Sequence, residues 1–235
     1  PQKTINQVWS DNPTQATPTW LGGVYVTAIS GSACTASTTC QLFVQSAETF
    51  PSFAAGAQQA IRVLVFPPAV TDFVPLAVGD KIDLYGPVWR HTSGGQNELF
   101  VEIGSSYPGC AKKIGSGNPT GTPGVTLDDL TLAAYETTHG PLLVTLAAVS
   151  GKPKKPNETF ALFKSFQIED GGIANVTSLS PFFLAGGMFT TLTEGSLVNF
   201  TSLTGVFGLF VPSGSTIKYE EIYPRSAADM VKGGT

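Results

Sequence analysis

Short apolar segments separated by glycine, proline and small polar residues run along the whole chain, a pattern that predicts β-strands. Two of the longer segments, residues 21–31 and 140–151, both end in Ser-Gly. Their alternation of apolar and polar positions is partial, as expected for strands that bend and are covered on both faces in places. Each is followed by further strand patterns in the same order, so we interpret them as the first strands of two copies of one unit.

The later strand patterns recur about 120 residues apart. The predicted second to fifth strands are residues 41–45, 61–66, 76–86 and 98–103 in the first copy, and 163–168, 173–176, 192–205 and 217–222 in the second. In the second copy Asp170-Gly171 supplies the turn between the second and third strands, since glycine adopts the positive φ that a tight hairpin needs. In the first copy, residues 46–59 enlarge that turn.

Two similar lead-ins precede the first strands, and a linker composition separates the copies. Residues 4–8 match residues 126–130, and a capping residue followed by apolar positions predicts a short helix or turn there. Residues 108–124 are rich in glycine and proline, which is typical of linkers. The predicted division is therefore a first barrel at 1–107, a linker at 108–124 and a second barrel at 125–235.

The turn motifs carry a resemblance to a known family. In the second copy, residues 167–174 are a strand ending in Asp-Gly, followed by Leu192–Gly195. In the first copy, Leu76–Lys81 fits the pattern Leu-x-x-Gly-Asp, whereas Ser196 replaces that aspartate in the second. Together they resemble the secreted or surface bacterial tandem OB-fold domains that accompany extracellular nucleases and lipoproteins. The resemblance implies an all-β fold of two tandem five-stranded OB-type Greek-key barrels joined by the Gly/Pro-rich linker. It implies no nuclease activity, because in that family the catalytic residues lie in other domains.

The composition of the chain narrows the classes of binding partner. Charged residues make up 13% of the chain, compared with roughly 25% in an ordinary globular domain. The apolar share of 42% is ordinary, so the low charge does not indicate disorder. The net charge of −4 and the scattered basic residues argue against nucleic-acid binding, which depends on clustered lysine and arginine.

The composition favours an extracytoplasmic protein: periplasmic, surface-bound or secreted. We expect no transmembrane helix, because the apolar runs are interrupted well before about 18 residues.

Cysteine and histidine usage bears on disulfides and metals. Cys34 and Cys40 flank a short polar stretch and form a candidate disulfide in an oxidising compartment, which leaves Cys110 as the odd cysteine. The only histidines are His91 and His139, and neither lies at ligand spacing from the cysteines, so no metal is expected.

No arrangement of residues indicates catalysis. Neither histidine has a nearby serine–aspartate or cysteine partner of the kind that activates a nucleophile. Glu220 and Glu221 are adjacent on a predicted strand and point to opposite faces, so they cannot act as an acid–base pair. We therefore predict no enzymatic activity and no cofactor.

Candidate binding residues follow from the way OB barrels bind, which is on the face of strands two and three and in the loops joining strands one–two and four–five. In the two copies, the candidates are Phe43, Arg62, Trp89, Arg90, His91, Phe182 and Phe183. Aromatic rings with arginine stack on bases and sugars, and they also form hot spots of protein interfaces. For each phenylalanine the alternative is burial in a core, and a barrel-capping helix is the alternative for residues 181–189.

These observations predict a non-enzymatic binding or assembly module at the cell surface, acting as a protein-interaction or structural subunit. Low charge, apolar loops and an odd cysteine favour a protein partner or self-assembly. The alternative is an accessory module of a secreted system that binds a glycan or, against the charge balance, a nucleic acid.

Overall fold

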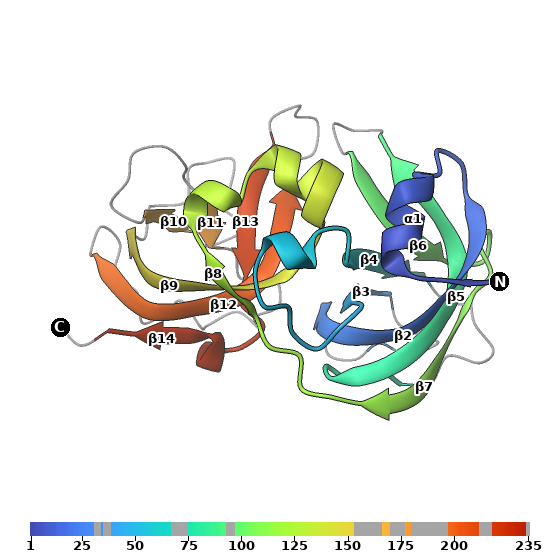
Figure 1. Ribbon diagram of the computed structural model, residues 1–235, viewed down its shortest axis with the longest axis horizontal. Coiled ribbons are helices and arrows are strands. Elements are labelled where there is room, and N and C mark those ends of the chain that lie inside the picture. The colour runs from blue at the N-terminus through green and yellow to red at the C-terminus, as the bar shows by residue number, and fades with distance from the viewer. Residues whose placement is uncertain are drawn as a thin grey trace.

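A computed structural model of the chain describes residues 1–30, 34, 39–66, 75–92, 97–152, 166–169, 177–179, 197–211 and 218–233. The described residues form two seven-stranded sheets with a few short helices (Figure 1). The prediction of an all-β protein is confirmed. Among the helices of these residues, none has the length and apolarity needed to cross a membrane.

The first sheet closes on itself and forms the first barrel. Its strands are β1 (Gln2–Lys3), β2 (Thr17–Ser30), β3 (Cys40–Gln45), β4 (Ala60–Val65), β5 (Asp80–His91), β6 (Glu98–Ile103) and β7 (Cys110–Ser116). Pairing runs β2, β3, β4, β6, β5 and back to β2, with β1 added to β2 and β7 to β5. Only the β1–β2 and β4–β6 pairs are parallel. Alternating residues such as Ile82 and Leu84 point inward and are fully buried.

The second sheet, here the second barrel, repeats the same circuit. Its strands are β8 (Thr122–Val125), β9 (Leu143–Lys152), β10 (Phe166–Glu169), β11 (Thr177–Leu179), β12 (Val198–Phe210), β13 (Tyr219–Tyr223) and β14 (Met230–Lys232). Pairing runs β9, β10, β11, β13, β12 and back to β9, and β11–β13 is parallel as β4–β6 is. The third strand was expected at residues 173–176, which lie outside the described residues, and the strand that is seen follows them directly.

Helix capping explains the two lead-ins. Thr4 caps helix α1 (Ile5–Asp11) in a capping box with Gln7, and Thr126 caps the 3-10 turn η3 (Leu127–Asp129) in a capping box with Asp129. In both, the threonine hydroxyl and the polar side chain three residues later satisfy backbone N–H groups that lack helical partners. The match of lead-ins expected from sequence is therefore present in the local structure.

Most of the segment predicted as a linker belongs to the two sheets. Residues 110–116 form β7 and pair with the first half of β5, and residues 122–125 form β8 and pair with β9. The short connection between them is also held, because the Thr120 N–H donates to the Glu48 carbonyl at 3.0 Å. The reason is that β6 pairs only with the last residues of β5, so β7 satisfies the backbone groups along its first half.

The barrels share a buried interface. One core cluster joins Ala28 and Phe43 of the first barrel to Leu143, Val206 and Tyr223 of the second. The side chains that meet there are all 5% exposed or less. Burying this apolar area favours a fixed arrangement of the barrels.

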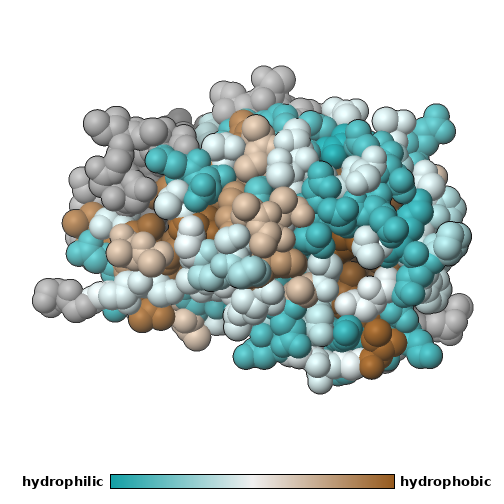
Figure 2. Space-filling view, viewed as in Figure 1, coloured by the Kyte–Doolittle hydropathy of each residue, from teal (hydrophilic) through white to brown (hydrophobic). Residues whose placement is uncertain are grey.

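The enlarged β3–β4 turn also reaches the second barrel. Phe50 joins the core of that barrel, and the Phe53 ring stacks on His139 with centroids 3.6 Å apart. His139 lies in the π-helical segment η4 (Ala134–His139). The 3-10 turn η1 (Ala54–Gly56) begins just after Phe53 and exposes its two alanines. Figure 2 shows a pale apolar area near the centre of the molecule, where Figure 1 draws this turn. The enlarged turn thus acts as a structural contact between barrels.

Candidate functional site

A cross-strand row of side chains crosses the outer face of the first barrel. Phe43 on β3 pairs with Arg62 on β4, Arg62 pairs with Phe100 on β6, and Phe100 pairs with Trp89 on β5. Paired residues on neighbouring strands point to the same side of a sheet. The row therefore places three residues predicted from sequence, Phe43, Arg62 and Trp89, on one face.

The second barrel covers the Phe43 and Arg62 end of this row. Phe43 is 2% exposed and lies in the shared core cluster. The Arg62 guanidinium forms an ion pair with Glu98 at 2.8 Å, and the Tyr135 hydroxyl of η4 donates to the same carboxylate at 2.5 Å. In this arrangement of the barrels, Phe43 and Arg62 hold the barrels together, and neither offers an open surface to a ligand.

The covered end is electrostatically coupled. Burial has the largest single effect and would lower the pKa of Arg62, but the Glu98 charge and hydrogen bond, together with Tyr135 and Tyr223, outweigh it, so the pKa is raised. Burial, with the Glu98 charge added to it, raises the pKa of Tyr135 well above 10.0. Burial, reinforced by Glu221, also raises the pKa of Tyr223 well above 10.0. The interface therefore holds a charged arginine and two neutral tyrosines.

The other end of the row is an aromatic surface made of Trp89, His91, Phe100 and Tyr107. The Trp89 ring centroid lies 5.4 Å from His91 in an edge-on contact, 5.7 Å from Phe100 and 6.2 Å from Tyr107. Trp89, His91 and Tyr107 are partly exposed, whereas Phe100 is buried beneath them. These four residues are the "aromatic surface" below.

Sequence reasoning missed two members of the aromatic surface. Phe100 stands between Glu98 and Glu102 in β6, at a position where alternation puts side chains on the outside. A phenylalanine at an outward, otherwise acidic position was the available signal. Tyr107 follows β6 and is held by a bridge to Gly104, a contact with no sequence signature.

Arg90 points toward the second barrel. Its Nε donates to the Asn12 side chain at 2.6 Å, and one terminal nitrogen donates to the Glu136 carbonyl of η4 at 2.7 Å. Its guanidinium also lies over the Trp9 ring, 5.6 Å from the centroid. Arg90 was expected in the loop joining the predicted fourth and fifth strands, but β5 extends through His91 because its last residues pair with β6. Alternation along the strand then sends Arg90 to the side opposite Trp89.

The remaining predicted residues divide into observed and undescribed ones. Cys34 and Cys40 form the predicted disulfide, with Cα atoms 5.4 Å apart. Phe182 and Phe183 lie outside the described residues, so their role stays a prediction. Within the described ranges, no group of three or more histidine, cysteine or acidic side chains is placed to hold a metal ion.

Comparisons with known proteins add little. No protein-family model and no curated protein matches the chain. Solved structures do match, among them one described as "Crystal structure of the tetrameric p202 HIN2". The similarity to that chain has 11% sequence identity and a TM-score of 0.28, and it covers 89% of this chain and 94% of the other. At this TM-score the likeness carries no argument about fold or function.

Proposed function

We propose that this protein is a non-enzymatic, extracytoplasmic binding module of two tandem OB-type barrels that docks a protein partner on the aromatic surface. The observation that carries the proposal is that the aromatic surface is continuous with residues that the second barrel covers. The aromatic surface and the Phe43–Arg62 end belong to one cross-strand row, and one half of that row already packs against protein.

The chemistry of the surface suits a polypeptide. Tryptophan and tyrosine dominate protein hot spots because they bury a large area with few rotatable bonds. Trp89 and Tyr107 are of this kind, and Glu102 lies on the same face of β6 as Phe100. We therefore expect the partner to contribute apolar side chains to the rings and a basic group to Glu102.

The geometry disfavours a nucleic acid at this surface. A base stacks on an open, flat ring, and phosphates need cations beside it. Here His91 stands edge-on to Trp89 at 87°, and Phe100 is tilted by 57°. Arg90, the nearest arginine in sequence, is engaged with Asn12 and Glu136.

Location and fold class rest on separate support. The Cys34–Cys40 disulfide is a feature of oxidising compartments. The closed circuit of strands, in which the third strand is parallel to the fifth, supports the OB assignment in both barrels. A single shared interface supports their acting as one unit.

The test compares Trp89→Ala with Trp20→Ala, because Trp20 is an exposed tryptophan on another part of the first barrel. A partner captured from native surface extract is purified, and its affinity for each protein is measured by calorimetry. Truncating a central hot-spot tryptophan is expected to weaken binding about 30-fold or more, whereas Trp20→Ala leaves it unchanged. Equal binding by Trp89→Ala and the parent, or no partner together with a monomeric mass in light scattering, refutes the proposal.

A further inference from the structure

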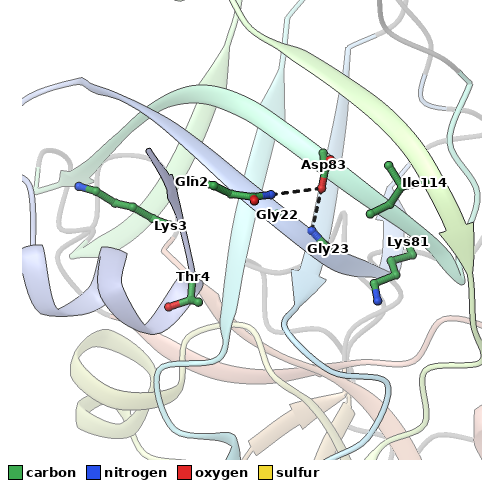
Figure 3. A pocket seen from close by; sticks show the side chains of 8 residues that line it. All are labelled: Gln2, Lys3, Thr4, Gly22, Gly23, Lys81, Asp83 and Ile114. Carbon is green, nitrogen blue, oxygen red and sulfur yellow. Dashed lines mark hydrogen bonds between the residues drawn. The ribbon is translucent and has the colours of Figure 1, made fainter.

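The first barrel carries an open groove on a different side, built by β1, β2, β5 and β7. It has a volume of about 500 Å³ and is lined by Gln2, Lys3, Thr4, Gly22, Gly23, Lys81, Asp83 and Ile114 (Figure 3). The N-terminus, where β1 begins, lies at the end of the molecule away from the second barrel (Figure 1). This groove therefore shares no residue with the aromatic surface.

Two glycines form the floor of the groove. The register between β2 and β5 shifts between Leu21 and Val24, so Gly22 and Gly23 make a bulge. Gly23 has a φ of +65°, which disfavours any other residue. A Cβ on Gly22 would lie 1.5 Å from the Gln2 side-chain nitrogen, so the Gln2 side chain lies directly against backbone.

Asp83 is the central polar group. Its Oδ1 accepts from the Gly23 N–H at 2.9 Å and from the Gln2 amide at 3.5 Å, as Figure 3 shows. Among the described residues, its Oδ2 accepts no hydrogen bond from a protein donor. One carboxylate oxygen therefore fixes the floor, and the other is available to a ligand donor.

The charges around Asp83 leave a groove that is not strongly cationic. Lys3 is held by Asp11 at 2.6 Å. Lys81 lies over the Tyr25 ring, 5.0 Å from its centroid, and forms no ion pair with another described residue. Lys81 and Asp83 thus supply one donor group and one acceptor group without the excess of positive charge that a phosphate backbone requires.

An aromatic platform adjoins these polar groups. Trp20 pairs with Gln2 on one side and with Tyr85 on the other, and Tyr85 lies two residues after Asp83 on the same face of β5. Trp20 is 37% exposed, and its ring centroid lies 5.9 Å from that of Tyr85. A half-exposed indole is thus available beside hydrogen-bonding groups.

From this placement we infer that the groove binds a carbohydrate chain. A sugar presents hydroxyl groups that donate and accept, together with an apolar C–H face. The Asp83 carboxylate and the Gln2 amide match the hydroxyls, and the Trp20 ring matches the apolar face. The Lys81 ammonium group only donates hydrogen bonds, so it matches the oxygen atoms of a sugar. It also pairs with a uronic-acid carboxylate.

The experiment measures binding of soluble hexasaccharides of glucose, of N-acetylglucosamine and of a uronic acid by calorimetry. The parent protein is expected to bind at least one, and Lys81→Gln separates the sources: it weakens the acidic sugar strongly and the neutral sugars slightly. Asp83→Asn keeps an oxygen for the Gly23 N–H but loses the charge, and weakens binding about tenfold or more.

Matched tryptophan variants make the result specific to the groove. Trp20→Ala is expected to weaken sugar binding about tenfold, whereas Trp89→Ala leaves it unchanged. For binding of the protein partner the opposite is expected: Trp89→Ala weakens it and Trp20→Ala leaves it unchanged. The two proposals can therefore be refuted independently of each other. The inference is overturned if the parent binds none of the sugars, or if folded Asp83→Asn and Trp20→Ala both bind as the parent does.

Discussion

Replacing Glu98 with leucine is the sharpest test of the interface between the barrels. Glu98 is 5% exposed and pairs with Arg62 at 2.8 Å, and the Tyr135 hydroxyl donates to it at 2.5 Å. Removing the carboxylate leaves the buried Arg62 charge without compensation. A broken buried ion pair destabilises a protein by about 3–5 kcal/mol. That is a large fraction of the roughly 5–15 kcal/mol that holds a typical domain folded.

Removing both charges should cost much less. In Arg62→Met with Glu98→Leu, neither member of the buried ion pair remains, and well-packed apolar replacements of buried pairs are often neutral or stabilising. The Tyr135 hydroxyl then lacks its acceptor, at a cost of about 1–3 kcal/mol. Adding Tyr135→Phe removes that hydroxyl, so the triple variant is expected to be closer to the parent than Glu98→Leu is.

Urea unfolding followed by circular dichroism and tryptophan fluorescence measures these differences. Trp9 is a useful reporter, because its Nε1–H donates to the Ala60 carbonyl at 3.0 Å. The control is the exposed pair Lys3–Asp11, whose removal by Lys3→Met with Asp11→Leu should change stability by less than about 1 kcal/mol. The electrostatic coupling of Arg62 and Glu98 is refuted if Glu98→Leu stays within about 0.5 kcal/mol of the parent. It is also refuted if the stability loss of the double variant equals the sum of the losses of the two single variants.

Three further predictions concern pH and redox state. Burial lowers the pKa of His139 below 6.5, so the unfolded chain binds the proton more readily than the folded protein does. The melting temperature should therefore fall as the pH drops below about 6.5, and it should fall less steeply in His139→Gln. The raised pKa values of Tyr135 and Tyr223 affect stability at alkaline pH, because the tyrosines of the unfolded chain ionise near pH 10. The free energy of unfolding should fall above about pH 10 by up to roughly 1.4 kcal/mol per pH unit for each tyrosine, and Tyr223→Phe should reduce this loss. Reducing Cys34–Cys40, which closes a short loop, should lower the free energy of unfolding by about 2 kcal/mol, and an unchanged urea midpoint under reductant would contradict this.

Much of the strand order was readable because it depends on local pattern. The predicted fifth strand of the first copy has the bounds of β6, and the threonine caps of both lead-ins are present. Alternation and capping are set by residues within a few positions of each other, so sequence alone carries them. The linker at 108–124 was less readable, because its pairing partners β5 and β9 lie elsewhere in the chain.

The sequence by itself indicated an all-β chain with two similar successions of strands, a candidate disulfide between neighbouring cysteines, and Trp89 as a candidate binding residue. Only the tertiary structure decided which parts of the binding face stay open. Phe43 and Arg62 have the composition of a ligand site, yet the second barrel covers them. The groove around Asp83 likewise joins β1, β2, β5 and β7, which closure of the barrel brings together. The physical reason is that the exposure of a side chain depends on contacts between segments that are distant in the sequence. Local periodicity carries no information about those contacts.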